Sequence, residues 1–156
     1  MEKHLAYVDG SFNKESDEYG AGAILIHPNG KMESFLSSDV LYSDQRNVAG
    51  EILAVRLVVD AALERNIKQM EIFYDYQGIG AWADGRWNAN TECTRSYTEY
   101  IRKARERMKI TFTKVKAHSG DKYNELVDGL AKKAIGIYKK PSFNENGYKF
   151  YMVGRK

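Results

Sequence analysis

A helical segment flanked by strand-like segments is the feature that most constrains the fold of this 156-residue chain. Residues 47–65 carry apolar side chains at helical spacing. Residues 31–36 before this segment and residues 68–75 after it have the composition of strands. A strand, a helix and another strand in this order imply a crossover connection and local parallel pairing. The chain is therefore expected to contain a parallel element covered by a helix.

The other segments extend this pattern to a mixed α/β sheet. Residues 3–12 and 20–27 read as strands, and the Pro28-Asn29-Gly30 turn should return residues 31–36 antiparallel to the strand before it. The remaining expected elements are a short helix at 76–84, a helix at 91–108, a strand at 110–115 and a helix at 122–138. The tail from residue 139 is assigned no secondary structure. One sheet with helices on its faces is predicted.

Composition sets broad limits. Hydrophobic residues make up 43% and charged residues 29% of the chain, as is usual for a globular protein. The net charge of +3 is compatible with nucleic acid binding but does not indicate it. Cys93 is the one cysteine, which excludes an internal disulfide and fits a reducing compartment. Neither a signal-peptide run nor a membrane-spanning length of apolar residues is present. These features predict a cytoplasmic protein with no membrane partner.

Four acidic residues stand where a sheet of this kind could bring them together. Asp9 is near the end of the first strand, Glu51 is where the long helix begins, Asp75 ends a strand, and Asp128 lies in the last helix. Four carboxylates in one pocket would repel one another, and divalent cations are the usual remedy. A metal-bearing acidic pocket in a mildly basic protein suggests cleavage of a phosphodiester backbone.

Each acid also has an ordinary structural explanation. Asp9 before Gly10 is typical of a turn, and Asp75 could cap the helix that starts at Tyr76. Glu51 gains from the macrodipole in a first turn, roughly 0.3–1 kcal/mol. That gain does not explain why Glu51 shares its helix face with core valines, since an unpaired buried charge is costly.

Residues 116–128 carry a further pattern. His118 lies in a loop with Ser119 and Gly120, and Asn124 and Asp128 follow four residues apart, which is one helical turn. A histidine in a surface loop is usually just solvated. Next to an acidic metal site, however, such a histidine can move protons at neutral pH.

Taken in this order, the motifs resemble those of type 1 ribonuclease H, of the bacterial ribonuclease HI kind. The resemblance runs from about residue 3 to about residue 138. It rests on these motifs: Asp9-Gly10-Ser11, the run from Tyr19 to Leu25, Asn47 through Glu51, Asp75-Tyr76-Gln77, and His118 with Asn124 and Asp128. It implies the ribonuclease H-like fold, a five-stranded mixed sheet flanked by helices. In that sheet strands 1–3 are antiparallel, and strands 1, 4 and 5 are parallel.

The resemblance also implies an activity, a cofactor and a site. The activity is endonucleolytic hydrolysis of the RNA strand of an RNA/DNA hybrid by two Mg²⁺ ions, with Mn²⁺ as a possible substitute, leaving 5′-phosphate and 3′-hydroxyl ends. Matched to the metal-binding and catalytic acids are Asp9, Glu51, Asp75 and Asp128, with His118 as the catalytic loop histidine. The expected substrate-binding residues are Gly10, Ser11, Asn47, Gln77, Trp87 and Asn124. Residues 1–140 would form the catalytic domain of a monomer, followed by a tail at 141–156.

Two rival functions stay open at the level of the sequence. The first is a module of this fold that binds hybrids without cutting them; the four mutually repelling acids argue against it. The second is another nuclease or strand-transferase of the same fold, such as an integrase or a resolvase. The His118 loop and the helix bearing Asp128 disfavour that alternative.

Overall fold

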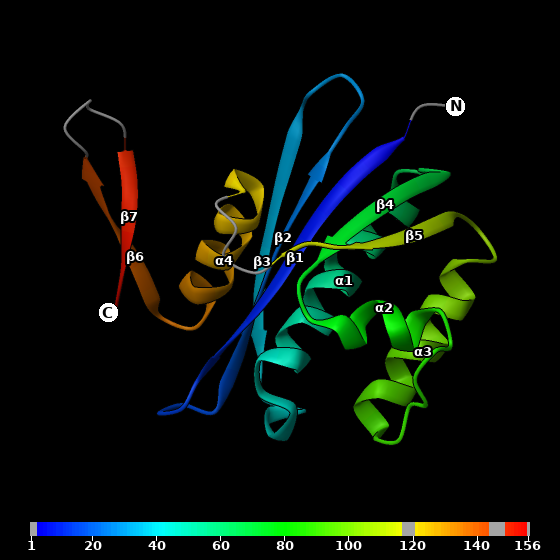
Figure 1. Ribbon diagram of the computed structural model, residues 1–156, viewed down its shortest axis with the longest axis horizontal. Helices are drawn as coiled ribbons and strands as arrows, with labels where there is room; N and C mark the ends of the chain where they lie inside the picture. The colour runs from blue at the N-terminus through cyan, green and yellow to red at the C-terminus, as the bar shows by residue number, and fades with distance from the viewer. Residues whose placement is uncertain (1–2, 117–120, 144–148, 156) are drawn as a thin grey trace.

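A five-stranded mixed sheet forms the centre of the computed structural model, which describes residues 3–116, 121–143 and 149–155 (Figure 1). The strands are β1 (His4–Asn13), β2 (Glu18–Ile26), β3 (Met32–Asp39), β4 (Gln69–Tyr74) and β5 (Lys109–Lys114), in the spatial order β3-β2-β1-β4-β5. β1 pairs antiparallel with β2 and parallel with β4, β2 pairs antiparallel with β3, and β4 pairs parallel with β5. The predicted topology is confirmed.

Four helices flank this sheet in the described part of the chain. They are α1 (Arg46–Glu64), α2 (Gln77–Ala83), α3 (Glu92–Ala104) and α4 (Lys122–Ala134), and a short 3₁₀ turn η1 (Ser43–Gln45) precedes α1. The crossover predicted for the long helix is confirmed, because α1 connects the antiparallel strands to β4, which pairs in parallel with β1. No helix within the described residues is both long enough and apolar enough to cross a lipid bilayer.

The two faces of the sheet bury different cores. Alternation along β1 sends Ala6 and Val8 into the larger core, together with Val55 of α1. Tyr7 points to the opposite face and packs with Val127 of α4 in a smaller cluster. By the same alternation, Asp9 belongs to the face that α4 covers.

Glycines let both helices approach the strands closely. A Cβ atom added to Gly10 of β1 would lie 2.2 Å from the backbone nitrogen of Glu51 in α1. On the other face, a Cβ atom on Gly22 of β2 would lie 2.3 Å from the backbone oxygen of Val127 in α4. Real Cβ contacts are never this short, so the two helices can sit at these positions only because the side chains are absent.

The C-terminal part differs from the prediction. α4 ends at Ala134 rather than at residue 138, and Gly136 has a φ of 81°, a left-handed conformation typical of the residue that follows a helix. The segment predicted to lack secondary structure contains two strands, β6 (Ile137–Phe143) and β7 (Lys149–Arg155), which pair antiparallel in a sheet of their own. In Figure 1 they stand beyond α4, away from α1, α2 and α3.

Candidate active site

Two of the predicted acids are positioned by neighbouring parallel strands. Tyr7 of β1 is level with Phe73 of β4 in the register of the two strands. Two residues further along, the chain reaches Asp9 in β1 and Asp75 directly after β4. The parallel pairing therefore brings Asp9 and Asp75 together beyond the end of β4, where ligand sites of α/β sheets are usually found.

The third acid, Glu51, reaches this place from α1. Its side chain is buried, with only 2% of its surface exposed. One carboxylate oxygen, Oε1, accepts a hydrogen bond of 2.9 Å from the backbone N–H of Tyr76, the residue after Asp75. Because α1 begins at Arg46, Glu51 lies in the second turn and not in the first, so the macrodipole explanation of its position is wrong.

The alternative role of Asp75 as a helix cap is also wrong. The N-cap residue of α2 is Tyr76, and no side chain makes a capping hydrogen bond there. Asp75 is half-buried, and its charge acts on both Asp9 and Glu51. The position of Asp75 is therefore not explained by the needs of α2.

The fourth acid, Asp128, comes from α4 on the other side of the strands. Its Oδ2 atom accepts a 2.9 Å hydrogen bond from the ammonium group of Lys132, one turn later in the helix. This ion pair is not among the sequence predictions, although an acid and a lysine four residues apart in a helix are a known stabilising pair. Asn124, one turn before Asp128, is buried, and α4 is capped by Asp121, which accepts the backbone N–H of Asn124.

Electrostatic interactions connect the four carboxyl groups. The pKa of Asp9 is raised from 3.8 to about 7, chiefly by burial; the charges of Asp128 and Asp75 contribute to this rise, and the Gly10 N–H opposes it. A hydrogen bond between Asp9 and Asp128 also favours the protonated form. Burial likewise raises the pKa of Glu51 well above its usual range, and the charges of Asp9 and Asp75 add to the effect. Such mutually destabilised carboxylates are typical of functional sites.

The donor set fits a hard divalent cation by its chemistry. Carboxylate oxygens are the ligands that Mg²⁺ and Mn²⁺ prefer. In the described part of the chain, however, no three His, Cys, Asp or Glu side chains are close enough together to hold one ion. The carboxylates instead bind groups of the protein: Asp9 binds the Gly10 N–H, Glu51 binds the Tyr76 N–H, and Asp128 binds Lys132. Each of these hydrogen bonds uses one oxygen of its carboxylate, so coordination of an ion need not break it.

The predicted substrate-binding residues surround these acids unevenly. Asn47 is exposed in the first turn of α1, and Gln77 is exposed at the start of α2. Gly10 and Ser11 follow Asp9 in β1, where Gly10 is packed against α1. His118 lies outside the described residues, so its predicted role stays a prediction.

Trp87 belongs to an aromatic cluster beside Asp75. Its ring centroid is 6.2 Å from that of Tyr76 and 5.7 Å from that of Trp82. Both Trp87 and Tyr76 keep more than a third of their surface exposed. Trp87 is among the predicted site residues, but its partner Tyr76 is not. Tyr76 stands directly after the acid and presents an aromatic surface at the rim of the site.

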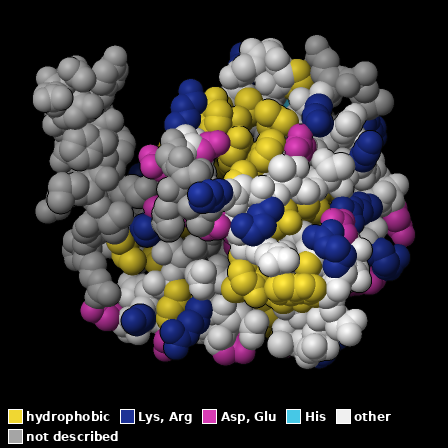
Figure 2. All heavy atoms as spheres, in the orientation of Figure 1, with side chains coloured by type: hydrophobic (Ala, Val, Ile, Leu, Met, Phe, Trp, Pro, Cys, Tyr) yellow, Lys and Arg dark blue, Asp and Glu magenta, His cyan; other side chains and the backbone are white. Residues whose placement is uncertain are grey.

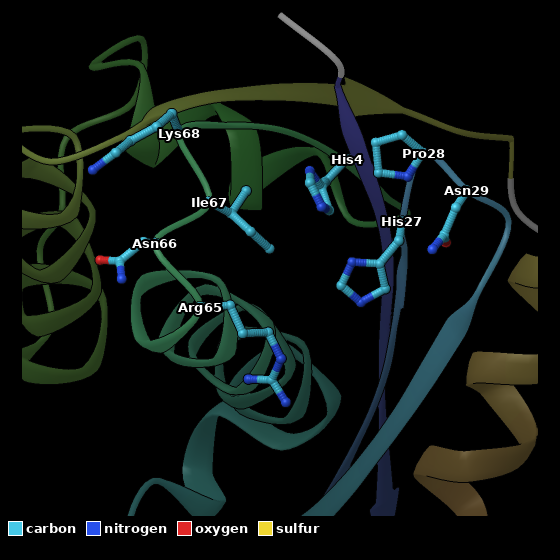
Figure 3. Close-up of a pocket in the computed structure, with 8 residues that line it drawn as sticks. All are labelled: His4, His27, Pro28, Asn29, Arg65, Asn66, Ile67 and Lys68. Carbon is cyan, nitrogen blue, oxygen red and sulfur yellow. The ribbon is translucent and has the colours of Figure 1, made fainter.

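One pocket of the structure is remote from the acids and is no candidate for the same chemistry. It lies at the opposite ends of β1 and α1, near His4 and Arg65 (Figure 3). Its lining contains no acidic residue. Arg65 and His27 both bind Glu33, so their polar groups already have a carboxylate partner. The acidic site is therefore the better candidate.

The pKa of Asp9 predicts that Asp9→Asn stabilises the protein at neutral pH. The folded-state pKa lies above the ordinary value, so the carboxyl favours folding in full below about pH 4, and this contribution is lost as the pH rises through about 7. The neutral asparagine avoids that loss. We expect Asp9→Asn to melt at a higher temperature than wild type at pH 8 in EDTA, and at the same temperature or lower at pH 4. The gain in unfolding free energy at pH 8 should be at most about 4 kcal/mol.

Asp39→Asn is the matched control for this experiment. Asp39 is exposed and, like Asp9, accepts the backbone N–H of the next residue, which an asparagine oxygen also accepts. Thermal unfolding of both variants at the two pH values separates the effect of exchanging carboxylate for amide at this hydrogen bond from the relief of repulsion between the acids. A melting temperature for Asp9→Asn below that of wild type at pH 8 would contradict the prediction.

Comparison with known proteins places this chain in a family. A family model described as RNase H matches residues 1–136. The chain is 28% identical over 149 residues to a protein named ribonuclease H from Neorickettsia sennetsu, and the match covers 88% of this chain and 96% of that protein.

Solved structures give the same answer for the fold. RNase H1 from the halophilic archaeon Halobacterium salinarum NRC-1 superposes with a TM-score of 0.72 at 20% identity, covering 86% of this chain and 98% of that one. LC11-RNase H1, solved in complex with an RNA/DNA hybrid, gives a TM-score of 0.67 at 16% identity, covering 85% of this chain and 99% of that one.

Proposed function

Since the chain belongs to the ribonuclease H family, we propose that it is an endonuclease that hydrolyses the RNA strand of RNA/DNA hybrids by two-metal-ion catalysis, leaving 5′-phosphate and 3′-hydroxyl ends. The observation that carries the proposal is the convergence of Asp9, Glu51, Asp75 and Asp128. Two of these four carboxyl groups have raised pKa values caused by burial and by the charges of the others.

The four acids are proposed to hold the two divalent ions, Mg²⁺ or Mn²⁺. When bound, such ions supply an activated water and stabilise the leaving 3′-oxygen. The burial of Glu51 and its hydrogen bond from the Tyr76 N–H fix one carboxylate between α1 and the end of β4. The position of Asp128 opposite Asp9 makes these two the acids whose mutual repulsion a bound cation relieves most directly.

Lys132 gives Asp128 a counter-charge of its own. The ammonium group lies 2.9 Å from the Asp128 carboxylate, and both side chains are about four-fifths buried. This positive charge offsets part of the repulsion between Asp128 and Asp9. We propose that Lys132 remains beside Asp128 as a positioning residue, while the other oxygen of the carboxylate turns towards the ion.

Recognition of the hybrid is proposed to use exposed polar groups beside the acids. RNA is distinguished from DNA by its 2′-hydroxyl groups, which are read from the shallow minor groove. Asn47 and Gln77 are exposed at the starts of α1 and α2, where amide side chains can reach that groove. Contacts of this kind are made to sugar and phosphate, so we expect low sequence specificity.

Three further residues complete the proposed site. Trp87 presents an exposed ring at the rim and is proposed to contact the hybrid. Asn124 is proposed to support Asp128 from the preceding turn of α4. His118 is proposed to assist proton movement or product release. The monomeric state and the cytoplasmic location expected from the sequence stay predictions.

A comparison of four substrates tests the proposed activity. We expect cleavage of the RNA strand of a hybrid in Mg²⁺, no cleavage in EDTA, and no comparable cleavage of duplex DNA, duplex RNA or single-stranded RNA. The mass of the 5′-terminal fragment distinguishes a 3′-hydroxyl from a 3′-phosphate end. Binding of the hybrid without cleavage in Mg²⁺ would favour the binding module, and cleavage of duplex DNA would favour another nuclease of this fold.

A further inference from the structure

Arg105, the residue that follows α3, links the end of α2 to β5. Its Nη1 atom donates a 2.9 Å hydrogen bond to the backbone oxygen of Ala83, and its Nη2 atom lies 2.8 Å from a carboxylate oxygen of Asp84. Nε and Nη2 also donate to the backbone oxygen of Ile110, at 3.3 and 2.9 Å. The guanidinium carbon lies 5.4 Å from the ring centroid of Phe112. One side chain therefore joins the last residue of α2, the residue after it and a strand of the sheet.

α2 depends on other elements for its position. It has seven residues, and helices shorter than about 12 residues are marginal on their own. Within residues 77–83, all of which are described, there is no basic residue in the last turn, and no side chain caps the start. Arg105 supplies a positive charge at the negative end of the helix dipole, together with a donor for a terminal carbonyl oxygen. Arg105 therefore provides at the end of α2 what the sequence of α2 lacks.

The segment after α2 carries Trp87 back towards the helix. The backbone N–H groups of Arg86 and Trp87 both donate to the oxygen of Ala81, at 2.8 and 3.2 Å. Asp84 uses one carboxylate oxygen for Arg105 and the other for Nη1 of Arg86, at 3.2 Å. Because Asp84 binds both arginines, the position of the segment that bears Trp87 depends on Arg105.

The rings that this arrangement holds in place form the aromatic cluster at the rim of the acidic site. Trp82 of α2 lies with its ring centroid 5.7 Å from that of Trp87 and 5.9 Å from that of Tyr76. Figure 2, in the orientation of Figure 1, shows hydrophobic side chains gathered in the region of α2, with Lys and Arg side chains next to them. Trp82 and Trp87 stand on either side of Ala83 and Asp84, the two residues that Arg105 binds.

We infer that Arg105 is a positioning residue that sets the geometry of the Tyr76, Trp82 and Trp87 cluster and thereby the affinity of the site for its substrate. The identification of that substrate as an RNA/DNA hybrid rests on the proposed function. A planar guanidinium with five donors binds three separate acceptors here, which the single ammonium group of a lysine does not match. Because Ala83 and Asp84 stand at the end of α2 remote from Asp75, the effect is on binding and not on the chemical step.

Tryptophan spectroscopy of the full chain tests the positioning role without any substrate. Trp82 and Trp87 are the only 2 tryptophans of the chain, so fluorescence excited outside the tyrosine band reports on this cluster alone. We expect Arg105→Gln to shift the emission to longer wavelength and to weaken the tryptophan circular dichroism in the near ultraviolet, while the far-ultraviolet spectrum stays that of wild type. Arg102→Gln is the matched control, because Arg102 is an exposed residue of the same helix that pairs with Glu99. This control should keep the tryptophan spectra of wild type.

Steady-state cleavage of a hybrid in Mg²⁺ measures the consequence for the substrate. We expect Arg105→Gln to raise KM about tenfold and to leave kcat within about twofold of wild type, the pattern of a lost binding interaction. Arg105→Lys keeps the charge but not the fork of donors, so its KM and its tryptophan spectra should lie between those of wild type and Arg105→Gln. A residue that only stabilises the fold would lower the melting temperature and leave both KM and the tryptophan spectra of the folded protein unchanged. That result would overturn the inference.

The remaining outcomes separate this inference from the proposed function. Altered tryptophan spectra in a protein that fails to cleave hybrids would support the positioning role and remove the proposed function. Normal cleavage by Arg105→Gln, with the KM and spectra of wild type, would do the reverse, and an equal change in Arg102→Gln would also overturn the inference. If Arg105→Gln does not fold, Arg105→Lys and Asp84→Asn decide by the same spectra, because each keeps part of the contact between Arg105 and Asp84.

Discussion

Replacing Asp75 with asparagine is expected to slow hydrolysis of a hybrid by at least about a thousandfold, or about 4 kcal/mol in the barrier, while leaving the fold intact. The charge of Asp75 raises the pKa values of both Asp9 and Glu51, so Asp75 interacts with two of the other acids. The amide has the shape of the carboxylate but not its charge, so it is a poor ligand for Mg²⁺. The fold should survive because Asp75 does not cap α2.

Cation binding can be measured separately from activity. A cation that binds only the folded state raises the melting temperature, and at a given concentration a tighter-binding cation raises it more. We expect Mg²⁺ to raise the melting temperature of wild type and of the control Asp39→Asn, and to have little effect on Asp75→Asn. Near-normal cleavage by Asp75→Asn, or an undiminished response to Mg²⁺, would remove Asp75 from the proposed site.

The placement of these acids could be predicted from sequence because each belongs to an element with clear periodicity. The crossover through α1 requires β4 to pair in parallel, and Asp75 must then emerge beside a neighbouring strand. Glu51 shares the buried face of α1 with Val55 and Val58, which indicated that its carboxylate points inward. Asp128 lies on a helix whose buried positions include Val127. In each case a repeating pattern over many residues determined the direction of one side chain.

The C-terminal strands could not be predicted because their pattern is not regular. Strand residues of a half-buried sheet alternate between apolar and polar, whereas residues 137–143 and 149–155 mix basic, aromatic and small residues. The end of α4 could have been predicted, since a glycine after an apolar helical run, here Gly136, is a common stop. Extending the helix to residue 138 ignored that glycine.

Gly10 shows a different limit of sequence reasoning. The sequence predicted it as a substrate contact through its place in the Asp9-Gly10-Ser11 motif. The structure adds a packing role, because a Cβ atom there would meet the first turns of α1. No pattern near Gly10 indicates a contact with a helix 40 residues later in the chain. The two roles predict different consequences for the same substitution.

Gly10→Ala is expected to destabilise the protein by at least about 3 kcal/mol, which lowers the melting temperature by roughly 6–12 °C for a chain of this size. The added Cβ atom would lie 2.2 Å from the Glu51 nitrogen and 2.3 Å from the Asn47 oxygen. Both are backbone atoms, so neither can rotate away. The start of α1 must shift from β1, and Glu51 must move away from the other acids.

Gly30→Ala is the control that isolates this packing effect. Gly30 has a φ of 90° but no atom within 4 Å of an added Cβ, so its replacement costs only about 1 kcal/mol of backbone strain. If Gly10→Ala melts within a few degrees of Gly30→Ala but binds the hybrid more weakly, Gly10 acts as the predicted substrate contact and α1 tolerates the methyl group. If it melts far lower and the remaining folded protein is inactive, the close approach of α1 to β1 is what places Glu51 in the site.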